Sequence, residues 1–586
     1  MLSFPPAWIL LLGALPVPYF TGRTRSWYVI ILPSLALLAV TALEPGTFWQ
    51  IHFFGFDLTL LRVDKLSRLF GIIFTLFAAV TSIYSYYMRD AKQHVAGLFY
   101  VGSALGVIFA GDLISLYFYW EIMAVSSVIL ILARQTTESY QAGCRYVMIH
   151  IFGGLCLLAG ILIYISATGN VEFSAFNAQN TATWLILIGI LVNAAAPPLS
   201  AWLTDAYPAA TVTGTVVLSA FTTKTAVYTL IRGFPGWEIL VLVGCFMALY
   251  GIIYAFLEND IRRILAYAII NQSGFKIAGV GVGSAMALNG AAINSFAHIM
   301  YMGLLFMAAG AVLHMTGRSK CTELGGLYKS MPWTMLLATV GVLAISAFPL
   351  TSGFTTKSLI IEGTASAHLF WAWIILEIAS AGVFLHAGLK FPYFTFFARD
   401  RGLRPGETNK CMLIAMGILA FLTIFLGVYP DPLYSLLPYP MPDYQVYTVP
   451  HVVTQLQLLL FSALIFFLLL PLLKPARNIS LDTDWFYRKG SQAAFAFFDT
   501  LGNGLNSICD KWFAGLARFV ATFFANAPAR IALFIMVNIW LMTGVRGRRL
   551  ELKKNKLYSD ILQSALPVGL GAAISTVFIG LIFVLS

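Results

Sequence analysis

The chain has 586 residues, of which 59% are hydrophobic and only 10% carry a charge. Soluble domains carry about 25% charged residues, so this composition excludes an ordinary soluble protein. Apolar stretches long enough to cross a bilayer recur along the whole length, which is typical of a polytopic helical membrane protein. We predict about 14–17 transmembrane helices, including interrupted ones, and no separate soluble domain.

Prolines interrupt one of the apolar segments in the first part of the chain. Pro197 and Pro198 remove backbone donors between two spans, so the helix there should break or kink. A lipid-facing break is not tolerated, and the break should therefore meet protein or a watery cavity. The predicted spans up to this point lie at 6–43 (two spans), 64–88, 94–110, 112–133, 139–167 and 181–232 (two spans).

A second interruption follows at 347–354, where Pro349 lies inside another apolar segment. Each interruption is near a lysine, Lys224 or Lys357. Paired broken segments in two halves are the sequence sign of inverted-repeat transporters, whereas ordinary kinked helices are the alternative. The later spans are expected near 264–283, 286–315, 333–350, 367–398, 410–430 and 452–475.

The C-terminal segment differs from the rest. Between 484 and 524 the apolar residues recur at steps of three and four, which predicts a long amphipathic helix at the membrane surface or along partner subunits. Two spans, at 528–545 and 560–586, flank a basic segment. We therefore divide the chain into N-terminal helices, a core, additional helices and an extension, at 1–60, 61–400, 401–475 and 476–586.

The net charge of +11 does not indicate a nucleic-acid partner, because the basic residues lie in short loops between apolar segments. One set of alternate loops holds Arg23, Arg25, Arg89, Lys92, Arg134 and Arg145. The other set holds acidic residues, with Arg62 as the main exception. The positive-inside rule then places the N-terminus outside and the Arg23 loop in the cytoplasm. The first span lacks a basic leader and a clear cleavage site, so we expect it to be retained.

The sequence predicts no cofactor and no metal site. The six cysteines are scattered, without a CxxC pair or a Cys/His pair at metal spacing, so they fit small residues in helix packing better than ligands. The glycines at 279, 281 and 283 lack the strand–turn–helix context of a dinucleotide loop. A free-standing enzyme is not expected.

Three charged residues lie in the middle of apolar runs: Glu121, Lys224 and Lys357. A charge at mid-bilayer costs roughly 3 kcal/mol on insertion scales, so such residues face the protein interior or a watery path. Charge movement is the default hypothesis, and a structural hydrogen-bond anchor is the alternative. Further candidates are His298, Lys276, His150 and Lys390, and for Lys276 and Lys390 snorkelling to an interface is an equal alternative.

Five segments, in order, resemble one family. They are 61–70 (LRVDKLSRLF), 111–121 (GDLISLYFYWE), 197–206 (PPLSAWLTDA), 260–274 (DIRRILAYAIINQSG) and 348–357 (FPLTSGFTTK). They are similar to motifs of the antiporter-like subunits shared by respiratory complex I, membrane-bound hydrogenases and multisubunit Mrp-type cation/proton antiporters. Within that family, the chain resembles most the D-type subunits of the Mrp antiporters.

The resemblance implies two inverted five-helix halves, each with a broken helix and a half-channel, joined by a polar axis at mid-membrane. Glu121 matches the family's fifth-span glutamate, and Lys224 matches its eighth-span lysine. Lys357 matches the lysine at the second broken helix, and His298 matches the histidine of the family's HAxxKALLF segment.

Two positions depart from the family pattern. Asn193 occupies the place of the seventh-span lysine, and Met302 replaces the lysine of KALLF. Glu121 consequently lacks its usual partner, so we expect it either to pair with a different cation, such as Lys224, or to be protonated. The proton path has then been rerouted, or the subunit conducts poorly.

These features predict a proton- and cation-translocating subunit of an Mrp-type antiporter in a prokaryotic cytoplasmic (inner) membrane. Its expected partners are other membrane subunits, the lipid bilayer, H⁺, and Na⁺ or another monovalent cation, with no nucleic acid. Two alternatives remain open. One is a structural or ion-pumping arm of a redox-driven complex, and the other is an energy-coupling subunit of an inorganic-carbon or other solute pump.

Overall fold

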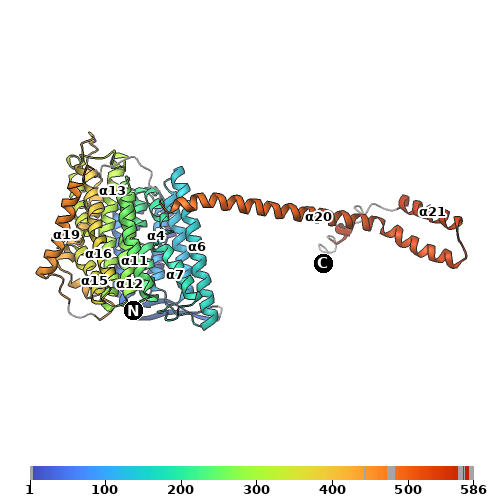
Figure 1. Cartoon of the computed structure of the whole chain (residues 1–586), viewed down its shortest axis with the longest axis horizontal. Helices are drawn as coiled ribbons and strands as arrows, with labels where there is room; N and C mark the ends of the chain where they lie inside the picture. Colours follow the sequence, from blue (N-terminus) through green and yellow to red (C-terminus); the bar gives the residue numbers. More distant parts are fainter. Residues whose placement is uncertain are drawn as a thin grey trace. The chain divides into compact units, whose positions relative to one another are not determined.

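The computed structural model describes residues 4–53, 55–440, 444–471, 482–564, 572 and 575–579 (Figure 1). The chain divides into two compact units, Met1–Trp485 and Phe486–Ser586. The described residues are mainly helical, which confirms the expected helical membrane fold. One antiparallel hairpin, β1–β2, adds to it between the spans predicted at 6–43 and 64–88.

The first unit begins with the hairpin and the helices of the N-terminal half. These elements are α1 (Pro6–Ala14), η1 (Val17–Tyr19), α2 (Gly22–Ala42), β1 (Gly46–Phe53), β2 (Phe56–Val63), α3 (Lys65–Tyr84), α4 (Ala91–Phe109), α5 (Leu113–Leu132), α6 (Thr137–Thr168), α7 (Thr181–Asn193), α8 (Ala201–Ala209), α9 (Val212–Leu218) and α10 (Thr222–Gly233).

The second half of this unit follows directly. Its elements are α11 (Ile239–Leu257), α12 (Ile261–Val282), α13 (Ala285–Thr316), η2 (Leu327–Lys329), α14 (Pro332–Ile345), α15 (Ser352–Ser366), α16 (Phe370–Val383), η3 (Phe384–Lys390), η4 (Tyr393–Phe397), α17 (Lys410–Val428), α18 (Asp431–Tyr434) and α19 (Val449–Leu468). The last two described helices of the chain are α20 (Asp484–Met542) and α21 (Arg548–Ser564).

Within the described part of the chain, ten helices are long and apolar enough to cross a membrane, and the chain is a multi-pass membrane protein. The shorter apolar helices α7 and α14 do not reach that length, because each ends at a break. These broken segments, counted as interrupted spans, are part of the larger number expected from sequence. The expected closing span at 560–586 lies largely outside the described residues.

The first break separates α7 from α8. Ala195 adopts a φ of 62°, and its N–H donates to the Val192 carbonyl at 3.1 Å. The N–H of Ala196 donates to the Leu191 carbonyl at 3.0 Å. This is a Schellman cap, in which the left-handed position is usually a glycine. Two prolines follow at once, and a residue without an N–H cannot continue the helix.

The second break, between α14 and α15, repeats this geometry. Ala347 has a φ of 55° and donates to the Ala344 carbonyl, and Phe348 donates to the Leu343 carbonyl, both at 3.0 Å. Pro349 then follows. Two helix breaks with the same backbone conformation and hydrogen bonds are expected if the two halves are related. The inverted arrangement of those halves stays a prediction.

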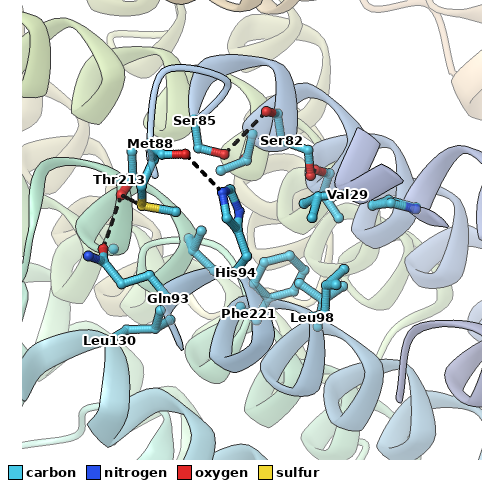
Figure 2. Close-up of a pocket in the computed structure, with 17 residues that line it drawn as sticks. Val29, Ser82, Ser85, Met88, Gln93, His94, Leu98, Leu130, Thr213 and Phe221 are labelled. Carbon is cyan, nitrogen blue, oxygen red and sulfur yellow. Dashed lines mark hydrogen bonds between the residues drawn. The ribbon is translucent and has the colours of Figure 1, made fainter. Parts of the chain in front are cut away.

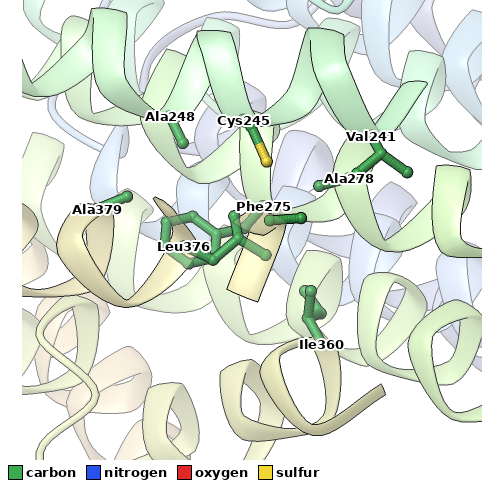
Figure 3. Packing of buried hydrophobic residues seen from close by; sticks show 9 residues of the cluster. Val241, Cys245, Ala248, Phe275, Ala278, Ile360, Leu376 and Ala379 are labelled. Carbon is green, nitrogen blue, oxygen red and sulfur yellow. The ribbon is translucent and has the colours of Figure 1, made fainter. Parts of the chain in front are cut away.

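The centre of the unit is formed by α12 and α13, whose residues are almost all buried. Close approach between α11 and α12 depends on small residues: a Cβ on Gly244 would lie 2.3 Å from the Ala278 nitrogen. Such small-residue contacts are typical of packing between membrane helices. Figure 3 shows the apolar cluster that joins α11, α12, α15 and α16 around Phe275 and Leu376. Polar residues on α12 and α13 are therefore shielded from lipid.

In the C-terminal part, α20 runs without interruption from Asp484 to Met542. The sequence predicts an amphipathic helix at 484–524 and a separate span at 528–545, whereas the structure forms both as one helix. The basic segment that follows lies at the start of α21.

The left-handed alanine at the second break gives a prediction about stability. Replacing Ala347 with glycine should raise the free energy of unfolding by about 1 kcal/mol, because glycine adopts a positive φ without a Cβ clash. The same change at Ala338, a buried position inside α14, should lower stability by roughly 0.5–1 kcal/mol. Thermal unfolding of the two purified variants measures the difference, and equal shifts for both would contradict this account of the break.

Candidate functional site

Lys224 lies in the first turn of α10 and is completely buried. Its Nζ donates to the Ser219 carbonyl at 2.6 Å. That carbonyl is free to accept because α9 ends at Leu218 and leaves its last carbonyls without helical partners. Glu121 was expected either to pair with a cation such as Lys224 or to be protonated. The structure does not form the pair with Lys224. Glu121 takes part in no ion pair among the described residues.

Lys276 and His298 form the centre of the site. They face each other from α12 and α13, with 2.9 Å between Lys276 Nζ and His298 Nδ1, and both are fully buried. One of the two nitrogens donates and the other accepts, so an extra proton bound by the pair can be carried by either residue. A basic pair without a carboxylate between helices of a membrane protein is suited to relaying a proton.

Lys357 lies on α15 and is 2% exposed. Its Nζ is 4.3 Å from the centroid of the Phe275 ring, but it has no hydrogen-bond partner among the described residues. The ammonium group is therefore held mainly by a cation–π contact, which is worth about 2 kcal/mol where the cation is desolvated. A buried ammonium with free donors is ready to bind water or an acceptor.

The Lys357 side chain lines a cavity of about 640 Å³. Glu362 and Glu377 also line it, together with His451 and Gln455. A cavity of this size holds many water molecules, because one water in the liquid takes up about 30 Å³. The cavity thus brings two carboxylates and an unpartnered ammonium into one space that is large enough for water. We call it the Lys357 cavity.

Neutral polar side chains accompany the three lysines. Tyr301 donates to Gln272 at 3.2 Å, and Gln272 donates to Asn271 at 3.1 Å. Asn294 donates to the Thr356 hydroxyl at 3.2 Å, next to Lys357 in the sequence. The helices that carry these lysines pack together: α10 and α15 both contact α12 and α13. A polar axis therefore runs from α10 through α12 and α13 to α15.

The N-terminal half contains the remaining candidates. Glu121 is partly exposed on α5, and a Cβ on Gly154 would lie only 2.3 Å from its Oε1, so the glycine gives the carboxylate room against α6. His150 is stacked on Tyr146, with ring centroids 4.0 Å apart. Asn193 lies close to His150. Neither of these two side chains forms a hydrogen bond of ordinary geometry with a described residue.

Figure 2 shows a smaller cavity of about 50 Å³ between α2, α3, α4 and α9. The His94 ring nitrogen Nε2 lies 3.2 Å from the Met88 carbonyl there, and the Thr213 hydroxyl is oriented toward Gln93. Phe221, three residues before Lys224, also lines the cavity. It has room for one or two water molecules.

Lys390 has a different geometry from the other lysines. Its Nζ donates to the carbonyls of Ala255, Phe256 and Glu258 at 3.3, 2.6 and 2.6 Å. These are the last carbonyls of α11, which a lysine side chain commonly caps. All three protons of the ammonium are thereby used, so the contacts account for Lys390 as a helix cap. Met302 is buried on α13 among apolar residues.

Glu377 is a site residue that the sequence analysis missed. It lies on α16 within the run Trp-Ile-Ile-Leu-Glu-Ile-Ala, and its charge acts on Lys357. An ionisable residue inside an apolar run is the same signal that marks Glu121, so the sequence contained it. His386 was also missed; it is fully buried and its Nδ1 lies 2.9 Å from the Gly382 carbonyl.

Comparisons with known proteins show which chains this one resembles. Residues 110–382 match the family model described as NADH:quinone oxidoreductase/Mrp antiporter, transmembrane. A Na(+)/H(+) antiporter subunit A1 of Staphylococcus aureus is 28% identical over 484 residues, covering 72% of this chain and 60% of the relative. The chain therefore spans about 60% of the length of these curated relatives. They are A-type subunits, whereas the sequence motifs indicated a likeness to the D-type.

Two solved structures share the fold. A chain of the Mrp complex from Dietzia sp. has a TM-score of 0.67 at 20% identity, covering 74% of this chain and 96% of that one. A chain of the membrane-bound sulfane sulfur reductase, an archaeal respiratory membrane complex, also has a TM-score of 0.67, at 24% identity, with 74% and 95% covered. The family match over residues 110–382 includes four of the five motifs in full and agrees with the resemblance expected from the sequence.

Proposed function

We propose that the chain is a proton- and cation-translocating subunit of a multisubunit membrane complex of the Mrp antiporter type. The observation that carries this is the polar axis, in which Lys224, Lys276, His298 and Lys357 are buried without a carboxylate bonded to any of them. Buried charges of this kind are expensive, and they mark ion pathways. The names of the Staphylococcus relatives support the exchange of H⁺ for Na⁺ or another monovalent cation.

Proton movement along the axis follows from repulsion between like charges. When one lysine is protonated, a proton on its neighbour is disfavoured, because unit charges interact strongly in a low-dielectric interior. A proton that enters at one end therefore favours release at the other. The Lys276–His298 pair lies between Lys224 and Lys357 on this route, and a proton can pass between its two nitrogens across the 2.9 Å contact.

Lys276 supplies an ionisable group in a chain that lacks two lysines of the family pattern. With Asn193 and Met302 neutral, the chain lacks ionisable groups at both positions. Lys276 adds an ammonium group at a place where the family is usually apolar. We infer that the route has been shifted to Lys276 and His298 rather than lost, and that the Lys357 cavity is the hydrated outlet at its end.

Glu121 has a coupling role in this proposal. Its side chain is partly exposed on α5, with Oε1 buried beside α6. The exposed apolar side chains of Phe118, Ile122 and Val125 lie on the same helix. An apolar membrane face of this kind fits contact with another subunit or with lipid. We infer that Glu121 responds to a neighbouring subunit of the complex. His150 then links Glu121 toward Asn193, and Lys390 acts as a structural cap.

The location follows from the same reasoning. The alternation of basic and acidic loops supports an N-terminus outside and the Arg23 loop inside a prokaryotic cytoplasmic membrane. The expected partners are other membrane subunits, which the long α20 is suited to contact by its exposed apolar side chains, such as Phe497, Leu501 and Leu505.

A second function is favoured by one observation. The fold is also that of a chain in a sulfur-reducing respiratory complex, and the neutral Asn193 and Met302 fit a subunit that holds a redox module in place and conducts little. Purification in mild detergent, with partners identified by mass spectrometry, separates the two. Small membrane proteins alone would support the antiporter, and iron–sulfur or nickel proteins would support the redox-driven complex.

The first test of the proposal is Lys276→Met, which removes the ammonium and keeps the length of the side chain. Proton transport driven by the complex in everted vesicles should fall by about a hundredfold, the effect typical of a group that relays protons. Lys92→Met changes an exposed lysine outside the axis and should leave transport unchanged. Wild-type transport in the Lys276 variant would show that the axis does not carry protons.

The second test examines the Lys357 cavity. Lys357→Met and Glu377→Gln should each slow transport, and the double variant should be no slower than the more impaired single one. Residues that act as a unit are strongly non-additive, because the first change already disables the step. Transport rates of the four forms, measured at equal protein levels, complete the cycle. A loss in the double variant equal to the product of the single losses would rule out a shared role.

The third test concerns Glu121. Glu121→Gln preserves the shape and removes the charge, so it should abolish the coupling of proton flux to the second ion, as should Glu121→Ala. Glu138→Gln, an exposed glutamate in the first turn of α6, is the matched control. Flux of both ions is followed with a pH dye and a sodium-sensitive dye. Unchanged coupled transport in both Glu121 variants would refute the assigned role.

A further inference from the structure

A second charged cavity lies apart from the polar axis, at the face of the protein that carries the β1–β2 hairpin. It has a volume of about 450 Å³. Arg62, Lys65 and Arg232 supply its positive charges, Asp64 supplies a negative one, and Tyr439 closes one side. We call it the Arg62 pocket. The transport proposal makes no use of it.

Two of the charges in the pocket neutralise each other. Arg232 Nη2 donates to both carboxylate oxygens of Asp64, at 2.7 and 3.0 Å. Its Nε donates to the Tyr228 hydroxyl at 2.9 Å. Asp64 also accepts from the Ser67 N–H as the N-cap of α3. The carboxylate is thus held by Arg232 and by the N-terminus of α3, and it accepts no hydrogen bond from Arg62 among the described residues.

Arg62 is compensated only by a long ion pair. Its side chain is only 15% exposed, and its nearest acid is Glu172 at 3.8 Å, which is 66% exposed. Nε and Nη2 of Arg62 are buried and have no hydrogen-bond partner among the described residues. Burial lowers the pKa of the Arg62 guanidinium, and the charge of Arg232 lowers it further. Leaving charged donors buried and unpaired is costly, so the structure keeps two donors in place for an acceptor.

The backbone around Arg62 is held rigidly. Thr59 N–H donates to the Asp112 carboxylate at 2.8 Å, and Gly111 N–H donates back to the Thr59 carbonyl at 2.9 Å. Leu113 N–H donates to the Val171 carbonyl at 2.8 Å. The hairpin, the α4–α5 turn and the segment before Glu172 are thereby tied together. Arg62 is therefore positioned before any ligand arrives.

We propose that the Arg62 pocket binds an oxyanion of the phosphate type, either the phosphate of a phospholipid headgroup or free phosphate. The planar guanidinium offers parallel N–H donors that match two oxygens of one phosphate, and Lys65 adds a mobile positive charge at the rim. Basic pockets at the ends of membrane helices are suited to lipid headgroups. Arg62 is also the main exception to the loop charge pattern, and a ligand of opposite charge gives a reason for it.

The test uses the full-length chain purified in an uncharged detergent, with thermal unfolding as the readout. One arm titrates sodium phosphate against sodium chloride at equal ionic strength. The other arm titrates a short-chain phosphatidylglycerol against an uncharged glycolipid detergent. Arg62→Gln removes the proposed anchor, Glu172→Gln removes the competing acid, and Arg318→Gln removes an exposed arginine elsewhere.

The wild type and Arg318→Gln should be stabilised by at least one of the two ligands. Arg62→Gln should weaken binding and raise the apparent Kd by about tenfold, whereas Glu172→Gln should strengthen binding and lower the apparent Kd. Stabilisation by both ligands would identify a general phosphate site, and stabilisation by phosphatidylglycerol alone would identify a lipid site.

The proposal is overturned if neither ligand stabilises the wild type. It is equally overturned if Arg62→Gln and Glu172→Gln both bind the ligand as the wild type does. Should Arg62→Gln fail to fold, an unchanged Kd in Glu172→Gln overturns the proposal by itself, because that exposed acid competes directly for the Arg62 guanidinium.

Discussion

The structure depends on one constraint: ammonium groups at mid-membrane must be kept away from lipid without being neutralised by bonded carboxylates. The fold meets this by placing Lys224, Lys276 and Lys357 around α12 and α13, which other helices surround. Each ammonium then has a substitute for an acid: a carbonyl for Lys224, an imidazole for Lys276 and an aromatic face for Lys357. Such neutral partners hold a charge weakly enough for the proton to leave.

The breaks in α7 and α14 and the tight packing of α11 on α12 serve the same constraint. A break exposes backbone groups that only protein or water can satisfy, so it brings polar surface into the interior next to the axis. The Schellman caps at Ala195 and Ala347 place these breaks at fixed points. The second leads directly into α15, and Ala347 lines the Lys357 cavity. Helix packing and hydration are thus arranged together along the chain.

The helical membrane fold and the buried lysines could be predicted from sequence, because apolar length and a charge within it are local signals. The contacts between side chains on different helices could not be predicted in the same way. Lys276 meets His298 because α12 and α13 face each other, and Lys390 caps α11 because a π-helical segment turns it there. Glu377 was missed although its signal was local. The β1–β2 hairpin was missed because its strands have only eight residues each and lie between much longer apolar segments, although Leu58, Leu61 and Val63 of β2 are buried.

The central claim is that a hydrated polar route joins the lysines through the Lys276–His298 pair to the Lys357 cavity. A structure of the complete complex in lipid, at a resolution that shows water molecules, tests it most directly. The account predicts ordered waters that link Lys224 to the pair and the pair to Lys357, continuing into the cavity lined by Glu377. A dry, apolar gap between His298 and Lys357 in every conformation of the complex would contradict it.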